Sequence, residues 1–224
     1  MRHFSPPLLA VVALLASPRL AAGQDFPPPE QAARLAQGEP PSPVGPILAV
    51  GLGWGGATTI DDTKGGNLAA QFKAGKYFHG LAGLRIEQVG LALIYRQGTP
   101  GVASGACPGG GCDGKSKQVG GLAMFTNGAG PGPLFNLGLG WWTDQVEIQR
   151  NGALVQRLDG WGLIEYFAVE VPVGPPTSRF RLGGFLILAI SNYDKQVTPG
   201  GSIKIPVGVA QPTWGEIGLR ASFF

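Results

Sequence analysis

The chain has 224 residues, of which only 14% are charged, and its formal net charge at pH 7 is +3. Its mean hydropathy is slightly positive, at +0.13, yet no stretch reaches the roughly 18 to 20 continuous apolar residues that a transmembrane helix needs. No basic cluster of the kind that binds nucleic acid occurs, so a nucleic-acid partner is not expected. Apolar residues placed at every second position of many short segments would give this composition, which indicates β-structure.

The first 23 residues have the pattern of a secretory signal peptide. Arg2 and His3 precede an apolar run at 8–16, and the small residues 21–23 follow. We expect cleavage after Gly23 and no lipid anchor, because no Cys stands at that site. The export signal contains two of the 17 basic residues. Its removal leaves 15 basic and 14 acidic residues, so the mature chain is nearly neutral.

Residues 24–45 are rich in proline and predict an extended linker. Proline fixes φ and lacks an N–H donor, so regular structure there is limited to a short helix at 31–36. A disordered periplasmic arm and a short helix folded into the mouth of the following domain both remain open.

The rest of the chain, residues 46–224, predicts about eight strands in a single domain. The clearest is 134–149, where Phe135, Leu137, Leu139 and Trp141 alternate with small or polar residues. The expected strands are 47–55, 68–78, 81–97, 117–125, 134–149, 154–171, 179–193 and 212–224.

The last of these strands carries a resemblance to a known class. It alternates in character and ends on aromatic residues, with Leu219, Ala221 and Phe223 in one series and Phe224 one step beyond. It resembles the terminal strand of bacterial outer-membrane β-barrels, in which a final aromatic residue belongs to the assembly signal. The class is that of small OmpA-like and OmpX-like eight-stranded barrels, and it implies a transmembrane antiparallel up-and-down β-barrel, outer-membrane lipid as surroundings and the barrel-assembly machinery as a partner.

The connections fit such a barrel, with long loops outside and short turns inside. With the first strand running outward, the outer connections are 56–67, 98–116, a tip at Asn151 and 194–211. The inner turns are His79-Gly80, 126–133 and 174–178. Aromatic residues are expected in an outer belt at Trp54, Tyr95, Trp161, Tyr193 and Trp214, and in an inner belt at Tyr77, Phe78, Phe125, Phe135, Phe180 and Phe223.

Two cysteines lie in the second outer loop. Cys107 and Cys112 are the only cysteines, and an even number in an exported chain predicts a disulfide. A metal site would need further soft ligands there, so no metal and no cofactor is expected.

Several polar residues are predicted to face the lumen. Arg181, Glu216, Arg220 and Asn136, with Glu165 or Glu170, are the candidates. A charge in a narrow interior has to be paired or hydrated. The interior is therefore either a plug of ion pairs or a thin polar channel, and both stay open.

Residues 144–159 predict a hairpin around Asn151 and Gly152, a pair suited to a type I′ turn. This register places Ile148 opposite Val155 and Glu147 opposite Gln156. The hairpin is longer than a bilayer crossing needs, so its end should project outward with free edges. Such an edge could add a strand from a partner. Charges on a hairpin more often protect its edge from pairing, and those present here are Asp144, Glu147, Arg150, Arg157 and Asp159.

No catalytic arrangement is predicted. His79 is the only histidine after export and is expected in a solvated inner turn with no serine beside it. The expected function is a structural or surface-interaction barrel without catalysis, with a possible surface partner at the outer loops. The alternative is a narrow pore for small solutes. A soluble β-sandwich, which would bury Trp141, Leu186 and Leu219 in a dry core, is the structural rival.

Overall fold

A computed structural model describes residues 44–58, 72–107, 109–127, 132–175, 178–206 and 212–223. The predicted signal peptide, almost all of the predicted linker and Phe224 lie outside these residues. Within them, no helix is long and apolar enough to span a bilayer.

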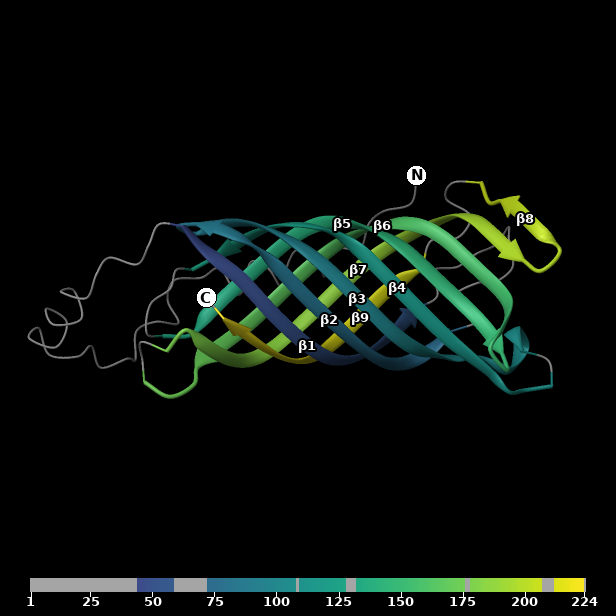
Figure 1. Cartoon of the computed structure of the whole chain (residues 1–224), viewed down its shortest axis with the longest axis horizontal. Coiled ribbons are helices and arrows are strands. Elements are labelled where there is room, and N and C mark those ends of the chain that lie inside the picture. The colour runs from purple at the N-terminus through teal and green to yellow at the C-terminus, as the bar shows by residue number, and fades with distance from the viewer. Residues whose placement is uncertain are drawn as a thin grey trace, which may run out of the picture. The chain divides into compact units, whose positions relative to one another are not determined.

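Eight long antiparallel strands form a closed ring (Figure 1). They are β1 (Val44–Thr58), β2 (Phe72–Ile86), β3 (Val89–Val102), β4 (Cys112–Thr126), β5 (Leu134–Arg150), β6 (Ala153–Pro172), β7 (Phe180–Thr198) and β9 (Thr213–Phe223). Each strand pairs with the next, and β9 closes the ring by pairing with β1 from Leu48 opposite Phe223 to Thr58 opposite Thr213. The fold is the predicted up-and-down β-barrel.

The two faces of each strand differ in character, as period-two alternation requires. On β5, Leu137, Leu139 and Trp141 point outward and are 43 to 59% exposed, whereas Trp142 points inward and is fully buried. Leu219 on β9 is 75% exposed. The β-sandwich alternative is therefore wrong, because the large apolar residues cover the outside of the ring instead of a dry core.

The first inner turn lies at Glu87 and Gln88, not at His79-Gly80 as predicted. Glu87 adopts a positive φ of 54°, and Ile86 pairs with Val89 across the turn. His79 lies in the middle of β2 with its side chain fully buried. The His-Gly pair was misread as a turn because its glycine continues an ordinary strand, while the real turn uses polar residues without glycine.

The hairpin between β5 and β6 turns at Asn151 and Gly152 as predicted, with Arg150 opposite Ala153. Its register differs from the prediction by one residue. Ile148 pairs with Gln156 and Glu147 with Arg157, because β6 carries an extra residue at Val155 and a shift occurs beside Gln149. Such a bulge cannot be read from alternation, since it changes the alternation itself.

Most of the projecting hairpin is also paired on its outer sides, whereas free edges were predicted. β4 pairs with β5 up to Cys112 opposite Arg150, and β6 pairs with β7 up to Arg157 opposite Val197. A short ninth strand, β8 (Gly201–Lys204), continues this sheet beyond β7. Figure 1 shows β8 standing off the ring at the end opposite the C-terminus. β8 therefore adds an exposed edge at the outer end, beside short unpaired edges at 112–115 of β4 and 153–156 of β6.

Candidate functional site

The barrel interior holds two clusters of polar side chains. The first is built around Arg96 of β3, whose Nε donates to Glu216 of β9 and whose Nη1 donates to Gln118 Oε1 of β4 at 3.0 Å. Gln118 Nε2 donates to Asp144 Oδ1 of β5 at 2.6 Å. We call Arg96, Glu216, Gln118 and Asp144 the outer cluster; it joins four strands of the ring.

One further strand, β7, contributes two hydroxyl groups to the outer cluster. Ser191 and Tyr193 of β7 both donate to Asp144 Oδ2, the tyrosine at 3.0 Å. Asp144 thus accepts three hydrogen bonds in the barrel interior and is 2% exposed. It was predicted as a charge that protects the hairpin edge, and that role is wrong because Asp144 lies on the inward face of β5.

Aromatic rings surround the guanidinium group of Arg96. Its Cζ lies 3.7 Å from the centroid of the Tyr77 ring, and the rings of Trp142 and Trp214 lie within 6 Å of it. Ring faces placed in this way attract the cationic guanidinium group electrostatically. Tyr77, Trp214 and Tyr193, predicted in the aromatic belts, are instead in this interior because they share the inward parity of their strands.

The second, inner cluster links Glu170 of β6, Arg220 of β9 and Asn136 of β5. Arg220 Nε lies 2.9 Å from Glu170 Oε1, and Asn136 Nδ2 donates to Glu170 Oε2 at 2.8 Å. Arg220 Nη1 also donates to the hydroxyl of Tyr166 at 2.6 Å. Each of these side chains is at most 2% exposed.

His79 lies between the two clusters. Its Nε2 is 3.4 Å from the hydroxyl of Tyr166, and its Nδ1 is 3.9 Å from Glu216 Oε1. The space for this ring comes from Gly51 on β1, where an added Cβ would stand 2.3 Å from Cε1 of His79. Gly51, on the inward face of β1, thus makes room for a side chain from the neighbouring strand β2.

The predicted lumen residues have the following positions. Asn136, Glu216, Arg220 and Arg181 face inward, and Arg181 donates to the carbonyl of Gly132 at the inner end at 3.0 Å. Of the two alternatives at the third position, Glu170 faces inward and Glu165 faces outward. Sequence reasoning missed Arg96, Gln118 and Tyr166, although Arg96 shares the parity of Ala92 and Ile94, opposite to the outward series of β3.

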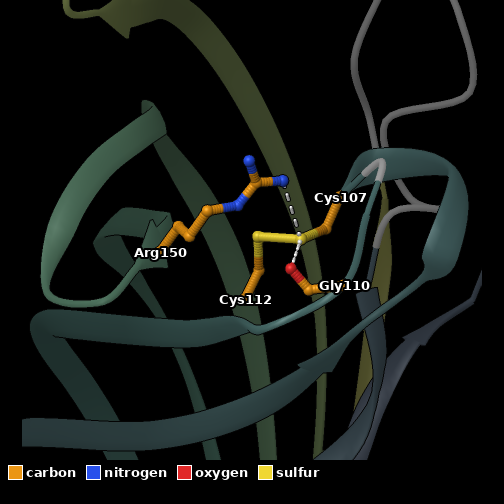
Figure 2. Close-up of a disulfide and its surroundings, with 4 residues drawn as sticks. All are labelled: Cys107, Gly110, Cys112 and Arg150. Atoms are coloured by element: carbon orange, nitrogen blue, oxygen red, sulfur yellow. Dashed lines mark hydrogen bonds between the residues drawn. A yellow bond between two sulfur atoms is a disulfide. The ribbon is translucent and has the colours of Figure 1, made fainter.

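The outer end of the barrel interior is lined by apolar side chains. Ile148, Val146 and Leu158 point inward beyond the outer cluster and are buried, while Glu147 lies on the outer face. The predicted disulfide joins Cys107 to Cys112 across a sequence separation of 5. Figure 2 shows the side chain of Arg150 reaching the disulfide, with Nη2 3.5 Å from Cys107 Sγ, so the loop tip is held against the end of β5.

Lysines lie on the outer face of β2 and β4, above the apolar surface. Lys73, Lys76, Lys115 and Lys117 are exposed, and Lys117 Nζ lies 6.0 Å from the ring centroid of Tyr95. An aromatic ring under a row of cations is the arrangement expected at the level of lipid headgroups. Phe223 and Leu219 are exposed on the outward face of β9, and Ala221 between them is half-buried.

A closed eight-stranded ring with an apolar exterior and a polar, filled interior defines a small β-barrel of the bacterial outer membrane. No protein-family model matches the chain, and no curated protein matches it in sequence. Among solved structures it is similar to Neisserial surface protein A (NspA), with 15% identity over 80% of this chain and 97% of that one and a TM-score of 0.56.

Two more solved structures show lower scores. Ail, the attachment invasion locus protein of Yersinia pestis, solved with the heparin analogue sucrose octasulfate, has 12% identity over 80% of this chain and 97% of that one, with a TM-score of 0.42. OmpT, an outer membrane protein of Vibrio cholerae, has 14% identity over 79% of this chain and 52% of that one, with a TM-score of 0.28.

Proposed function

We propose that the protein is a non-conducting outer-membrane barrel that carries a structured outer end for contacts at the cell surface and has no catalytic role. The observation that carries this proposal is the burial of the charged residues Arg96, Asp144, Glu170, Glu216 and Arg220, none of which is more than 2% exposed. A water-filled channel past these residues would leave their side chains accessible to water, so their burial supports a closed interior.

The same burial argues against catalysis in the barrel. His79 is fully buried between Tyr166 and Phe185, whose ring centroids lie 5.8 and 4.3 Å from its own. A general base has to reach a substrate proton directly or through one water molecule. The interior polar residues are therefore assigned to stability. Two of their contacts, Arg96 with Glu216 and Arg220 with Glu170, join strands that are not neighbours in the ring.

The surface role rests on the outer end itself, because the likeness to NspA extends to the fold alone. β5, β6 and β7 have 17, 20 and 19 residues, more than the roughly 9 to 11 that cross a bilayer. Their excess is ordered by pairing with β4 and β8, and a disulfide holds the adjacent loop. The lysines of β2 and β4 would lie against phosphate groups of the surrounding lipid.

The remaining parts of the proposal concern export and assembly. Residues 1–23 act as the export signal and residues 24–45 as a periplasmic linker. Leu219 and Phe223, outward on the closing strand, would contact the barrel-assembly machinery during insertion.

Single-channel recording in planar bilayers tests the closed interior. We expect no conductance at any applied voltage from the folded full chain, with insertion verified by its heat-modifiable mobility on gels. Stable conductance steps of reproducible size would instead favour the narrow pore for small solutes.

Labelling of single cysteines in intact cells tests the orientation. Ala153 at the outer hairpin and Gln88 at the opposite turn are both exposed. We expect a membrane-impermeant maleimide to label Ala153→Cys and to leave Gln88→Cys unlabelled until the outer membrane is opened. The reverse pattern would place the structured end in the periplasm and remove the surface role.

A further inference from the structure

Glu165 is a carboxyl group on the lipid-facing side of β6. Its side chain points outward in a series with Trp161 and Leu163 before it and Phe167 and Val169 after it. The residues paired with it on the neighbouring strands are Leu139 of β5 and Leu188 of β7. Glu165 therefore stands near the centre of an apolar surface, not at its rim.

No side chain in the described part of the barrel pairs with this carboxyl group. Among the described residues, Glu165 has no hydrogen-bond or ion-pair partner, and the nearest outward side chains are apolar. Acyl chains cannot donate or accept hydrogen bonds, so a carboxyl group in the hydrocarbon layer is costly unless another protein group meets it. Ionisable residues in such positions indicate a contact.

An apolar groove of about 610 Å³ lies beside Glu165 on the same outer surface. It is lined by Phe167, Val169, Gly184, Leu186, Ile217 and Leu219. The groove exists because Gly184 has no side chain. A Cβ added there would enter open space, since its nearest neighbour would be the carbonyl oxygen of Gly218 at 3.7 Å. The surface thus combines a polar group with a recess for apolar side chains.

We propose that this surface is the contact between two copies of the chain, related by a two-fold axis along the membrane normal that passes beside Glu165. Such an axis brings the two Glu165 carboxyl groups together, where a protonated one donates its O–H to the other. It also places β5 of each copy opposite β7 of its partner. Leu137 and Leu139, outward on β5 and 43 and 58% exposed, then enter the groove at Gly184.

A second copy fits this surface better than lipid because it contacts both the Glu165 carboxyl group and the apolar groove. Lipid chains would fill the groove and leave Glu165 unsatisfied. A two-fold axis supplies the missing donor from the same residue and the apolar ridge from the adjacent strand, so the interface is self-complementary.

Cysteine cross-linking tests the position of the interface. Leu163 neighbours Glu165 on β6, and Leu84 is 62% exposed on β2, across the ring from β6. In proteoliposomes with the native disulfide intact, a bis-maleimide should convert Leu163→Cys to covalent dimer at least about tenfold more efficiently than Leu84→Cys. Equal yields at the two positions would overturn the proposal.

Substitution of Glu165 tests the carboxyl pair. Glu165→Leu should raise the dimer dissociation constant about tenfold, as expected for the loss of one polar contact between membrane-spanning segments. Glu165→Gln should stay close to the wild type, because an amide both donates and accepts. Sedimentation equilibrium in density-matched micelles measures the constant, and heat-modifiable mobility confirms folding of each variant.

Two results would reject the proposal outright. One is a wild-type protein that stays monomeric at every protein-to-detergent and protein-to-lipid ratio. The other is a Glu165→Leu variant that dimerises as tightly as the wild type. In the first case the occupant of the surface would be a different membrane protein, and in the second the two copies would meet at a surface that does not include Glu165.

Discussion

Arg220 on β9 and Glu170 on β6 form an ion pair, with Nε 2.9 Å from Oε1, although β7 lies between their strands in the ring. The pair therefore adds a connection across the interior to the backbone hydrogen bonds that hold neighbouring strands. In the outer cluster, the contact of Arg96 with Glu216 likewise joins β3 to β9, which are not neighbours in the ring. The interior side chains thus reinforce the closure of the ring.

The buried pair should matter far more than a surface pair. We expect Glu170→Gln to lower the free energy of unfolding by about 3–5 kcal/mol, because it leaves the Arg220 charge buried without its counter-charge. Urea titration of the folded protein in lipid vesicles, followed by gel mobility, measures the change. The matched control is Asp159→Asn, which removes the half-exposed pair of Arg157 and Asp159 at 3.0 Å and should cost roughly 0–1 kcal/mol. Equal losses from the two substitutions would contradict a stabilising interior.

The two adjacent tryptophans of β5 test which face is in lipid. Trp141 is 59% exposed on the outside, and Trp142 is fully buried inside. In variants that keep one tryptophan each, brominated acyl chains should quench the fluorescence of Trp141 strongly and that of Trp142 little. Aqueous acrylamide should leave Trp142 unquenched as well, because water does not reach the interior. Strong acrylamide quenching of Trp142 would indicate an open lumen.

Gly51 should tolerate no side chain while His79 is present. The added methyl group of Gly51→Ala would stand 2.3 Å from the imidazole, so we expect a loss of roughly 1–3 kcal/mol in the free energy of unfolding, as for an overpacked core. Equilibrium denaturation in vesicles measures it. Gly80→Ala on the adjacent strand is the control, since its nearest contact is 4.0 Å away. The double variant with His79→Ala should recover part of the loss, and failure to do so would place the strain elsewhere.

The disulfide should stabilise the loop more than the barrel. Replacing Cys107 and Cys112 together by serine opens a ring of only a few residues, which restricts the unfolded chain by roughly 2 kcal/mol in the loop-entropy model. We expect the barrel to keep its heat-modifiable mobility and the loop before β4 to become much more sensitive to protease in intact cells. Loss of the folded barrel in this variant would show that the loop organises the interior.

Much of the barrel could be predicted from alternation alone. The parity of Leu137, Leu139 and Trp141 defines the outward face of β5, and the opposite parity places Asn136 and Asp144 inside. The alternation of apolar and polar residues is weakest at 72–97, where polar residues occur on both faces. The true turn at Glu87 and Gln88 contains no glycine or proline, so nothing in its composition marks it above His79 and Gly80.

The sequence by itself determined the number of long strands, their order and the character of the two faces, because period-two alternation is a local property of each segment. Only the tertiary structure decided which inward side chains meet. Arg96 finds Glu216 at a sequence separation of 120, and the bulge at Val155 shifts one register without changing composition. Such pairings depend on how the strands are staggered when the ring closes, and that stagger is set by the packing of all eight strands together.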